Sequence, residues 1–154
     1  MGRIIHIEIV AADHDRAADF YSKVFGWQVT PAPVPEGYLL AHTGEGEGID
    51  GAIMSSRYQT QPTIAWIDVD DIETTLDTAR GAGGEPVGEV QELPGVGRTC
   101  YLRDTEGVLI GLRQRSSWTT LGQPAAVSMW RARTRSSSVM PPASWLLIRN
   151  VMVV

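Results

Sequence analysis

Apolar and polar residues alternate at the start of the chain. Isoleucine occupies every second position there, at Ile5, Ile7 and Ile9. His6 and Glu8 stand between the isoleucines. Since successive side chains of a strand point to opposite faces, the alternation predicts a β-strand over residues 3–10. We expect the isoleucine face to be buried against a helix, with His6 and Glu8 pointing the other way.

An amphipathic helix is predicted directly after this strand. Asp13 stands where an N-cap side chain would accept hydrogen bonds from the first free amides of the helix. Apolar residues then recur at helical spacing, at Ala17, Phe20, Tyr21 and Val24. Gly26 follows, and glycine commonly ends a helix because it adopts the left-handed conformation without a steric penalty. The spacing predicts that the four apolar side chains form the buried stripe of the helix.

The same succession of patterns returns 58 residues later, where Asp71 aligns with Asp13 and Gly84 with Gly26. Either Asp70 or Asp71 is predicted to cap the second helix. The apolar stripe of the second helix is predicted at Ile72, Leu76 and Ala79. Each helix is followed by three strand-like runs, at residues 27–30, 38–42 and 51–54 and again at residues 86–92, 98–102 and 108–114. The sequence therefore predicts two βαβββ modules, over residues 3–59 and 62–114. One module alone cannot bury its sheet face, so the two should pack together.

Four stretches of the chain resemble a known family: IIHIEIVAAD, RAADFYSKVFGW, GIDGAIM and PGVGRTCYLRDTEGVLIGLRQ. They resemble the vicinal oxygen chelate superfamily, which includes glyoxalase I, bleomycin-resistance proteins and extradiol dioxygenases. The resemblance implies an α+β domain over residues 1–115, in which two tandem βαβββ modules form a glyoxalase-like open barrel around one cup. It also implies that a small organic molecule binds in the cup and that two copies of the chain pair as a homodimer.

Glyoxalase-type members hold a divalent metal with four side chains, and the resemblance assigns four positions in this chain. His6 matches the first position. The remaining positions fall on Gly51, Ile64 and Gly111, which offer no ligand. Asp50, next to Gly51, is expected to point the other way. Because a protein metal site usually needs three or more ligands, we expect no cofactor. A divalent metal held by His6, with Glu8 as a second ligand, is the alternative.

The repeat also predicts which side chains line the cup. If His6 and Glu8 point inward, the matching strand of the second module presents Trp66 to the same space. The predicted ligand-binding residues are Trp66, Tyr101, Arg103, Gly51 and Gly111. The two glycines would leave room for an organic ligand. For Trp66 and Tyr101, ordinary packing is the alternative interpretation.

Two classes of function fit such a cup. One is an enzyme of lyase or isomerase type, related to the glyoxalases or dioxygenases, in which His6 or Glu8 is the catalytic acid–base group. The alternative is a protein of the bleomycin-resistance type, which sequesters a small molecule without chemistry. The missing metal positions favour sequestration over a true glyoxalase, while Glu8 beside His6 keeps the enzyme hypothesis open.

Charge is distributed unevenly along the chain. Residues 1–106 hold all 18 acidic residues against 7 basic ones, whereas residues 107–154 hold six arginines and no acidic residue. The acidic body argues against nucleic acid as a partner, because it would repel phosphates. No apolar stretch approaches the roughly 20 residues of a membrane-spanning helix, so we expect no membrane partner. The single cysteine, Cys100, cannot form an internal disulfide and fits a cytoplasmic protein.

Residues 116–154 differ in composition from the rest. Ser, Thr and Arg are frequent there, and three of the five tryptophans occur there, at Trp118, Trp130 and Trp145. We expect a C-terminal extension that is irregular, with at most a short helix. Packing of its tryptophans on the barrel or on a second subunit is the alternative.

Overall fold

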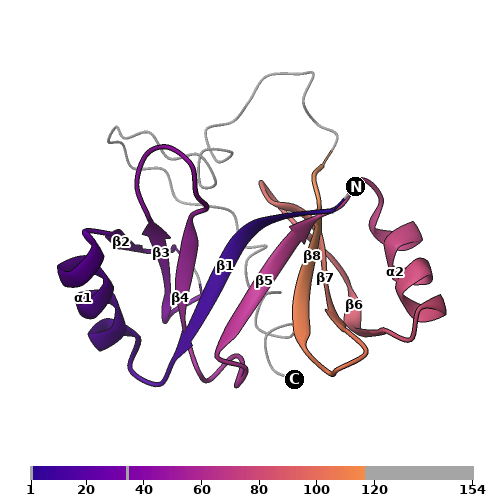
Figure 1. The fold of residues 1–154 in the computed structure, drawn as a ribbon, viewed down its shortest axis with the longest axis horizontal. Helices are drawn as coiled ribbons and strands as arrows, with labels where there is room; N and C mark the ends of the chain where they lie inside the picture. The colour runs from indigo at the N-terminus through magenta and orange to yellow at the C-terminus, as the bar shows by residue number, and fades with distance from the viewer. Residues whose placement is uncertain (1, 34, 117–154) are drawn as a thin grey trace.

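The computed structural model describes residues 2–33 and 35–116 of the chain. The elements of these residues follow one another in the predicted order (Figure 1). The first module comprises β1 (Arg3–Ala11), α1 (His14–Phe25), β2 (Gln28–Pro31), β3 (Tyr38–His42) and β4 (Gly51–Ser55). The second comprises β5 (Thr63–Asp68), α2 (Ile72–Gly81), β6 (Glu85–Leu93), β7 (Gly97–Arg103) and β8 (Leu109–Gln114). The two βαβββ modules are confirmed; the predicted extension beyond residue 116 lies outside the described residues.

The strands form one open, mixed sheet in the order β2-β3-β4-β1-β5-β8-β7-β6. At its centre β1 pairs antiparallel with β5, so the two modules meet there. Each of these strands also pairs in parallel with the last strand of its own module, β1 with β4 and β5 with β8. The same order of strands therefore runs outward from the junction in both directions, and α1 and α2 lie at opposite ends of the molecule (Figure 1). This is the predicted α+β open barrel.

Both helices begin where their aspartates predict. Asp13 accepts a hydrogen bond from the Arg16 amide at 2.9 Å, and Asp71 accepts one from the Thr74 amide at 2.7 Å. Each bond satisfies one of the amides that the first turn of a helix leaves without a partner. Gly26 then follows α1 with a φ of 72°. Local signals in the sequence thus set the start of equivalent helices in the two modules.

The burial of β1 differs from the expectation. His6 and Glu8 are only 2% and 1% exposed. The isoleucines expected to be buried, Ile5, Ile7 and Ile9, are only partly buried. The reason is that α1 covers the outer face of β1 loosely and buries none of its own residues. The face that carries His6 and Glu8 is enclosed more completely than the face that carries the isoleucines.

The two helices also differ in how they pack. In α2, Ile72 and Leu76 are buried in a cluster with Cys100, Leu102 and Leu112. Cys100 therefore packs beneath α2. In α1, Phe20 and Val24 are 55% and 54% exposed, so the prediction that both belong to a buried stripe was wrong. Aromatic side chains of α1 instead pack on one another: Tyr21 stacks on Trp27 with 4.8 Å between ring centroids, and Phe20 meets Tyr21 edge-on at 5.4 Å.

This difference leads to a testable prediction about stability. The Leu76→Ala variant should lose about 2–5 kcal/mol of unfolding free energy, because it opens a cavity in a closed cluster. The Val24→Ala variant removes a side chain that is more than half exposed, and its cost should stay within about 0.5 kcal/mol. Urea denaturation of both variants measures the difference. Equal losses would show that α1 and α2 contribute alike to the core, against the burial described above.

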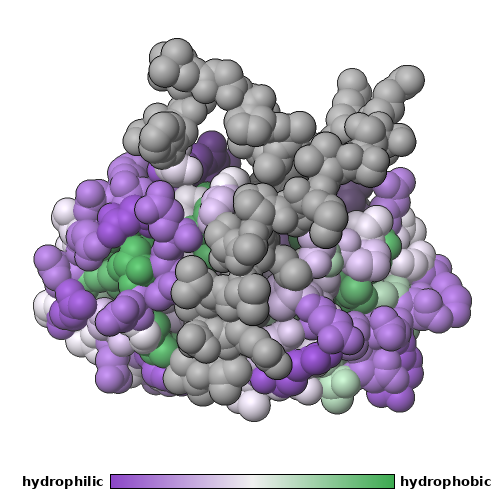
Figure 2. Space-filling view, turned by 180° about the vertical axis from the view of Figure 1, so that it is seen from behind, coloured by the Kyte–Doolittle hydropathy of each residue, from purple (hydrophilic) through white to green (hydrophobic). Residues whose placement is uncertain are grey.

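The described surface carries mixed polar and apolar residues. On the side seen in Figure 2, hydrophobic residues form small separate patches among hydrophilic ones. Neither helix of the described residues is long and apolar enough to cross a membrane.

Candidate functional site

The register at the junction of the modules defines the site. His6 of β1 pairs with Trp66 of β5, and Glu8 pairs with Ile64. Since paired residues of neighbouring strands share a face of the sheet, these four side chains point to one side. The pairing continues outward, because Trp66 pairs with Gly111 of β8 and Gly111 pairs with Tyr101 of β7. This common face, which we call the cup face, brings together His6, Glu8, Trp66 and Tyr101, as the sequence predicts.

A tyrosine that the sequence analysis did not single out joins the two polar residues of β1. The Tyr38 hydroxyl donates a hydrogen bond to Glu8 Oε1 at 2.8 Å, and His6 Nε2 lies 3.2 Å from the same hydroxyl oxygen. With the hydroxyl hydrogen directed to Glu8, His6 Nε2 must carry a proton and donate to Tyr38. Glu8, Tyr38 and His6 therefore form a continuous chain of hydrogen bonds, in which Glu8 and His6 are buried and Tyr38 is partly buried.

Burial shifts the pKa of both ends of this chain away from the charged form. Loss of solvation raises the pKa of Glu8 from 4.5 to about 7, although the Trp66 and Tyr38 donors act to lower it. Burial lowers the pKa of His6 from 6.5 to about 4; the negative charge of Asp50 opposes this shift and Arg113 adds to it. Glu8 therefore changes protonation near neutral pH, while His6 stays neutral. A group that titrates near the working pH is the kind that general acid–base catalysis requires.

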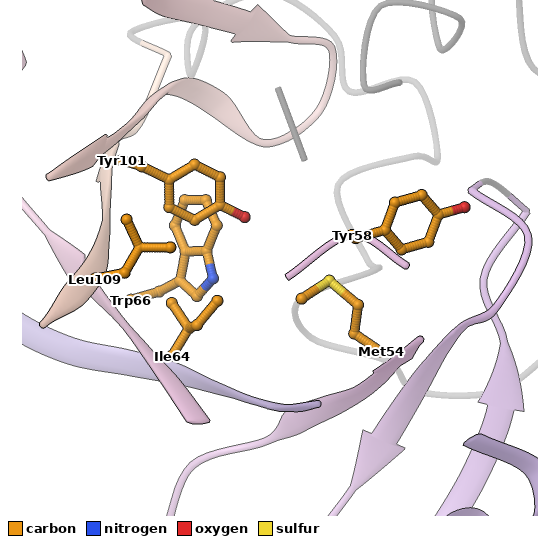
Figure 3. Packing of buried hydrophobic residues seen from close by; sticks show 6 residues of the cluster. All are labelled: Met54, Tyr58, Ile64, Trp66, Tyr101 and Leu109. Carbon is orange, nitrogen blue, oxygen red and sulfur yellow. The ribbon is translucent and has the colours of Figure 1, made fainter. Parts of the chain in front are cut away.

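Trp66 and Tyr101 form an aromatic wall opposite the first module. Both are buried, and their ring centroids are 5.3 Å apart. They belong to a cluster with Met54, Tyr58, Ile64 and Leu109. Figure 3 shows that the indole nitrogen and the phenol oxygen both point from this wall toward the side where Met54 and Tyr58 lie.

Polar atoms on this face are left without hydrogen-bond partners within the described part of the chain. They are Glu8 Oε2, Trp66 Nε1 and Tyr101 Oη, and all are buried. The indole N–H of Trp66 lies close enough to Glu8 to lower its pKa, but the geometry falls short of a hydrogen bond. A buried donor or acceptor without a partner costs free energy, so three such atoms on one face indicate a site for a polar molecule.

The register places the two predicted glycines differently. Gly111 lies on the cup face, and a Cβ there would come within 2.3 Å of the Trp66 ring. Gly51 pairs with Ile7 and therefore shares the opposite face, where a Cβ would lie 2.6 Å from the Ile7 carbonyl oxygen. Its neighbour Ala52, which pairs with Glu8, takes the place on the cup face. The expectation that Gly51 enlarges the cup is thus corrected, since the hydrophobic pattern of β4 does not reveal which face is concave.

Two arginine side chains near the ends of the strands, Arg103 and Arg113, make different contacts. Arg103 pairs with Leu109 on the cup face but is directed to the end of the strand, where it donates to the Gly107 carbonyl at 3.3 Å. Arg113, which also pairs along this face, is buried and bonds to Asp68 at 2.9 Å. The alternation of β8 places Arg113 two residues beyond Gly111, on the same face.

A second histidine lies at the edge of the cup face. His42 Nδ1 is 3.0 Å from both carboxylate oxygens of Asp50, which raises the pKa of His42. Asp50 also accepts a hydrogen bond from the Thr43 amide, and its charge acts on His6. The expectation that Asp50 points away from the cup is therefore corrected. The contact arises from the pairing of β3 with β4, which no local pattern shows.

The residues at the family's metal positions do not fit a metal ion. Ile64 and Gly111 carry no donor, and neither Gly51 nor Ala52 supplies one. The Trp66 ring covers Gly111, and His6 Nε2 bonds to Tyr38. Across residues 2–33 and 35–116, no three His, Cys, Asp or Glu side chains are grouped so as to hold a metal. We therefore assign no chemical step to a metal ion.

An open barrel of two βαβββ modules, with a buried polar chain where they meet, defines a glyoxalase-like protein. The family model of the Glyoxalase/Bleomycin resistance protein/Dioxygenase superfamily matches residues 3–112. The chain belongs to this family.

Relatives and solved structures agree with this assignment. The chain is 34% identical to a glyoxylase-like domain-containing protein of Didymella fabae, over 69% of this chain and 88% of that protein. It is 33% identical to a probable lactoylglutathione lyase of Vibrio parahaemolyticus, over 73% of this chain and 91% of that protein. The structure of methylmalonyl-CoA epimerase from Mycobacterium tuberculosis aligns with a TM-score of 0.57 and 19% identity, over 73% of this chain and 87% of that chain. At that identity the structural likeness shows the fold alone.

Proposed function

We propose that this protein is an enzyme of lyase or isomerase type that moves a proton on a small oxygen-bearing organic molecule bound at the cup face. The proposal is supported above all by Glu8, a buried carboxyl group whose pKa of about 7 lies near physiological pH. The names of two similar proteins, a probable lactoylglutathione lyase and a methylmalonyl-CoA epimerase, agree with this class of reaction.

In the proposed step, the Glu8 carboxylate removes a proton from a carbon next to a carbonyl group of the substrate. The electron pair of the broken C–H bond forms a C=C bond, and the carbonyl π electrons move to the oxygen. Glu8, now a neutral acid, returns the proton to the same carbon, where the C=C electron pair forms the new C–H bond and the oxygen electrons restore the carbonyl group. Tyr38 can donate to the carboxylate or accept from the acid, because a hydroxyl does both. It thus holds Glu8 in place in both protonation states.

His6 is proposed to have two effects. It positions the Tyr38 hydroxyl group that holds Glu8, and it leaves the charge near Glu8 unchanged. Because His6 is neutral at physiological pH, it adds no charge that would lower the pKa of Glu8. Trp66 and Tyr101 are proposed to contact the substrate. For Arg103 the observed bond to Gly107 supports a role at the rim of the cup only.

Hydrogen–deuterium exchange at carbon tests the proposed activity. A panel of small ketones, 2-oxo acids and 2-hydroxy ketones is incubated with the protein in heavy water, and proton NMR follows the loss of C–H signals. We expect at least one compound to exchange, at a rate that rises with pH through about 7 as the Glu8 carboxylate forms. The Glu8→Gln variant should exchange about 10²–10⁴ times more slowly.

Control experiments separate this activity from the alternative function. Glu89→Gln, which changes an exposed carboxyl group on β6, should leave exchange unchanged. If compounds raise the melting temperature but none exchanges, the protein is a sequestration protein of the bleomycin-resistance type instead. Exchange that persists at full rate in Glu8→Gln would exclude Glu8 as the acid–base group.

We further propose that the protein works in the cytoplasm as a homodimer. The reduced, buried Cys100 supports a reducing compartment. The exposed apolar side chains of α1, Phe20, Val24 and Phe25, offer a surface that a second copy could cover. Sedimentation equilibrium measures the mass in solution.

A further inference from the structure

We infer that Trp66 and Tyr101 donate hydrogen bonds to one oxygen atom of the ligand, and that the cup selects compounds with an anionic or strongly polarised oxygen on an apolar body. This inference rests on the proposed function, in which such an oxygen develops negative charge. It assigns to two side chains the polarising role for which the described residues offer no metal site.

The first observation is that two donors point the same way and complete no hydrogen bond within the described residues, although the Trp66 indole lies close enough to Glu8 to lower its pKa. The Trp66 indole N–H and the Tyr101 hydroxyl are buried and lack partners within the described residues. Figure 3 shows both polar atoms on the same side of the aromatic wall. An indole nitrogen can only donate, so its partner must be an acceptor. Burial and the nearby charge of Glu8 hold the pKa of Tyr101 well above its usual value, so its hydroxyl keeps its hydrogen.

The second observation is that the chain makes room for the indole at position 111. An ideal Cβ at Gly111 would lie 2.3 Å, 2.4 Å and 2.6 Å from three atoms of the Trp66 ring. Any residue other than glycine would collide with the ring there. The Trp66 side chain therefore occupies the space over Gly111 into which a longer side chain would project, and its N–H is held beside Glu8.

The third observation concerns the surroundings of the two donors. The side chains packed around Trp66 and Tyr101 are apolar or aromatic: Met54, Tyr58, Ile64 and Leu109. Hydrogen bonds to a charged oxygen are stronger in such surroundings than in water, because water does not compete. The indole N–H also acts on Glu8, so the bound oxygen would lie next to the carboxyl group that takes up the proton.

A pair of probes that differ in one oxygen atom tests the inference. The probes are 4-nitrophenol and 4-nitrotoluene, which share the apolar body but differ in the oxygen acceptor. Calorimetry measures the binding of each to the full chain, about one pH unit below the pKa of Glu8, where its carboxyl group is protonated. We expect the wild-type protein to prefer 4-nitrophenol. In Tyr101→Phe and Trp66→Phe this preference should fall by about 5-fold each, the usual effect of losing a hydrogen bond between uncharged groups, because 4-nitrophenol is largely protonated at this pH.

The ratio of the two affinities makes the test independent of general damage to the cup. A change that merely loosens the cup weakens both probes alike and leaves the ratio unchanged. An unchanged ratio in both variants would overturn the inference, and so would a wild-type protein that binds 4-nitrotoluene as well as 4-nitrophenol.

The Glu8→Gln variant distinguishes this inference from the proposed function. It should lose carbon exchange but keep the preference for 4-nitrophenol, because its donors are intact. Retained exchange in this variant contradicts the proposed function alone, whereas a lost preference in this variant contradicts the assignment of the donors to Trp66 and Tyr101.

Discussion

Replacing Glu8 with glutamine should stabilise the protein more above pH 7 than at low pH. The difference in unfolding free energy between Glu8→Gln and wild type should be about 3 kcal/mol larger above pH 7 than at low pH. In the folded protein the pKa of Glu8 rises from 4.5 to about 7 because the carboxyl group is buried. Between these values the unfolded chain releases the proton and the folded chain keeps it. The contribution of Glu8 to stability is therefore complete below pH 4.5 and is lost as the pH rises through 7. Glutamine has no proton to lose and should escape this penalty.

His6 should make the unfolding free energy of wild type depend less on pH than Glu8 alone would. Its pKa falls from 6.5 to about 4 on folding, so its contribution is present above pH 6.5 and is lost as the pH falls through 4. In wild type the two opposite slopes should nearly cancel between pH 4.5 and 6.5. In Glu8→Gln only the His6 slope remains, and stability should rise by about 3 kcal/mol over the same acid range.

Urea denaturation followed by circular dichroism, at pH steps from acid to neutral and above, measures both profiles. Glu89→Gln is the matched control, since it removes an exposed carboxyl group from β6 and should follow the wild-type curve. Parallel curves for wild type and Glu8→Gln across the whole range would show that Glu8 titrates alike in the folded and unfolded states.

Alanine at position 111 should be the most damaging small substitution on the cup face. A Cβ there would lie 2.3 Å from a ring atom of Trp66, so the indole must move or the β5–β8 pairing must open. Overpacking of this kind costs about 1–3 kcal/mol and occasionally more. We expect a lower free energy of unfolding and a loss of the preference for 4-nitrophenol, because the indole N–H is displaced.

A double-mutant cycle shows whether the damage comes from the ring. In a Trp66→Leu background, Gly111→Ala should cost far less than in wild type, because the shorter side chain leaves room for the new methyl group. Gly81→Ala is the control: Gly81 ends α2 and has open space where its Cβ would be. Additive effects of Trp66→Leu and Gly111→Ala would mean that the two positions do not contact each other.

Several parts of the molecule could be predicted because their signals are local. Asp13 and Asp71 each cap a helix through a bond to an amide three residues away, and such a contact depends on few neighbours. The alternation of His6 and Glu8 with isoleucines placed both polar side chains on one face for the same reason. The repeat then placed Trp66 on the matching strand before any pairing was known.

Other parts depend on distant segments and could not be predicted. Tyr38 bonds to Glu8 across 30 positions of sequence, and the register of β3 with β4 decides that contact. Gly51 was assigned to the wrong face because the register of the parallel pair β1–β4 was not known. A shift of that register by one residue moves each side chain of β4 to the opposite face. The exposure of Phe20 is a further case, since a helical stripe shows where apolar residues gather but not how closely a sheet approaches them.

The order of the elements, their caps and the two faces of β1 follow from the chirality and spacing of neighbouring residues, so the amino-acid sequence was enough to predict them. Which face of β1 is the more deeply buried depends instead on how the two modules pack together. Side chains of both modules surround the face of His6 and Glu8, whereas α1, which buries none of its own residues, leaves the isoleucines only partly covered. The shifted pKa of Glu8 is a product of that enclosure, since burial is its largest cause.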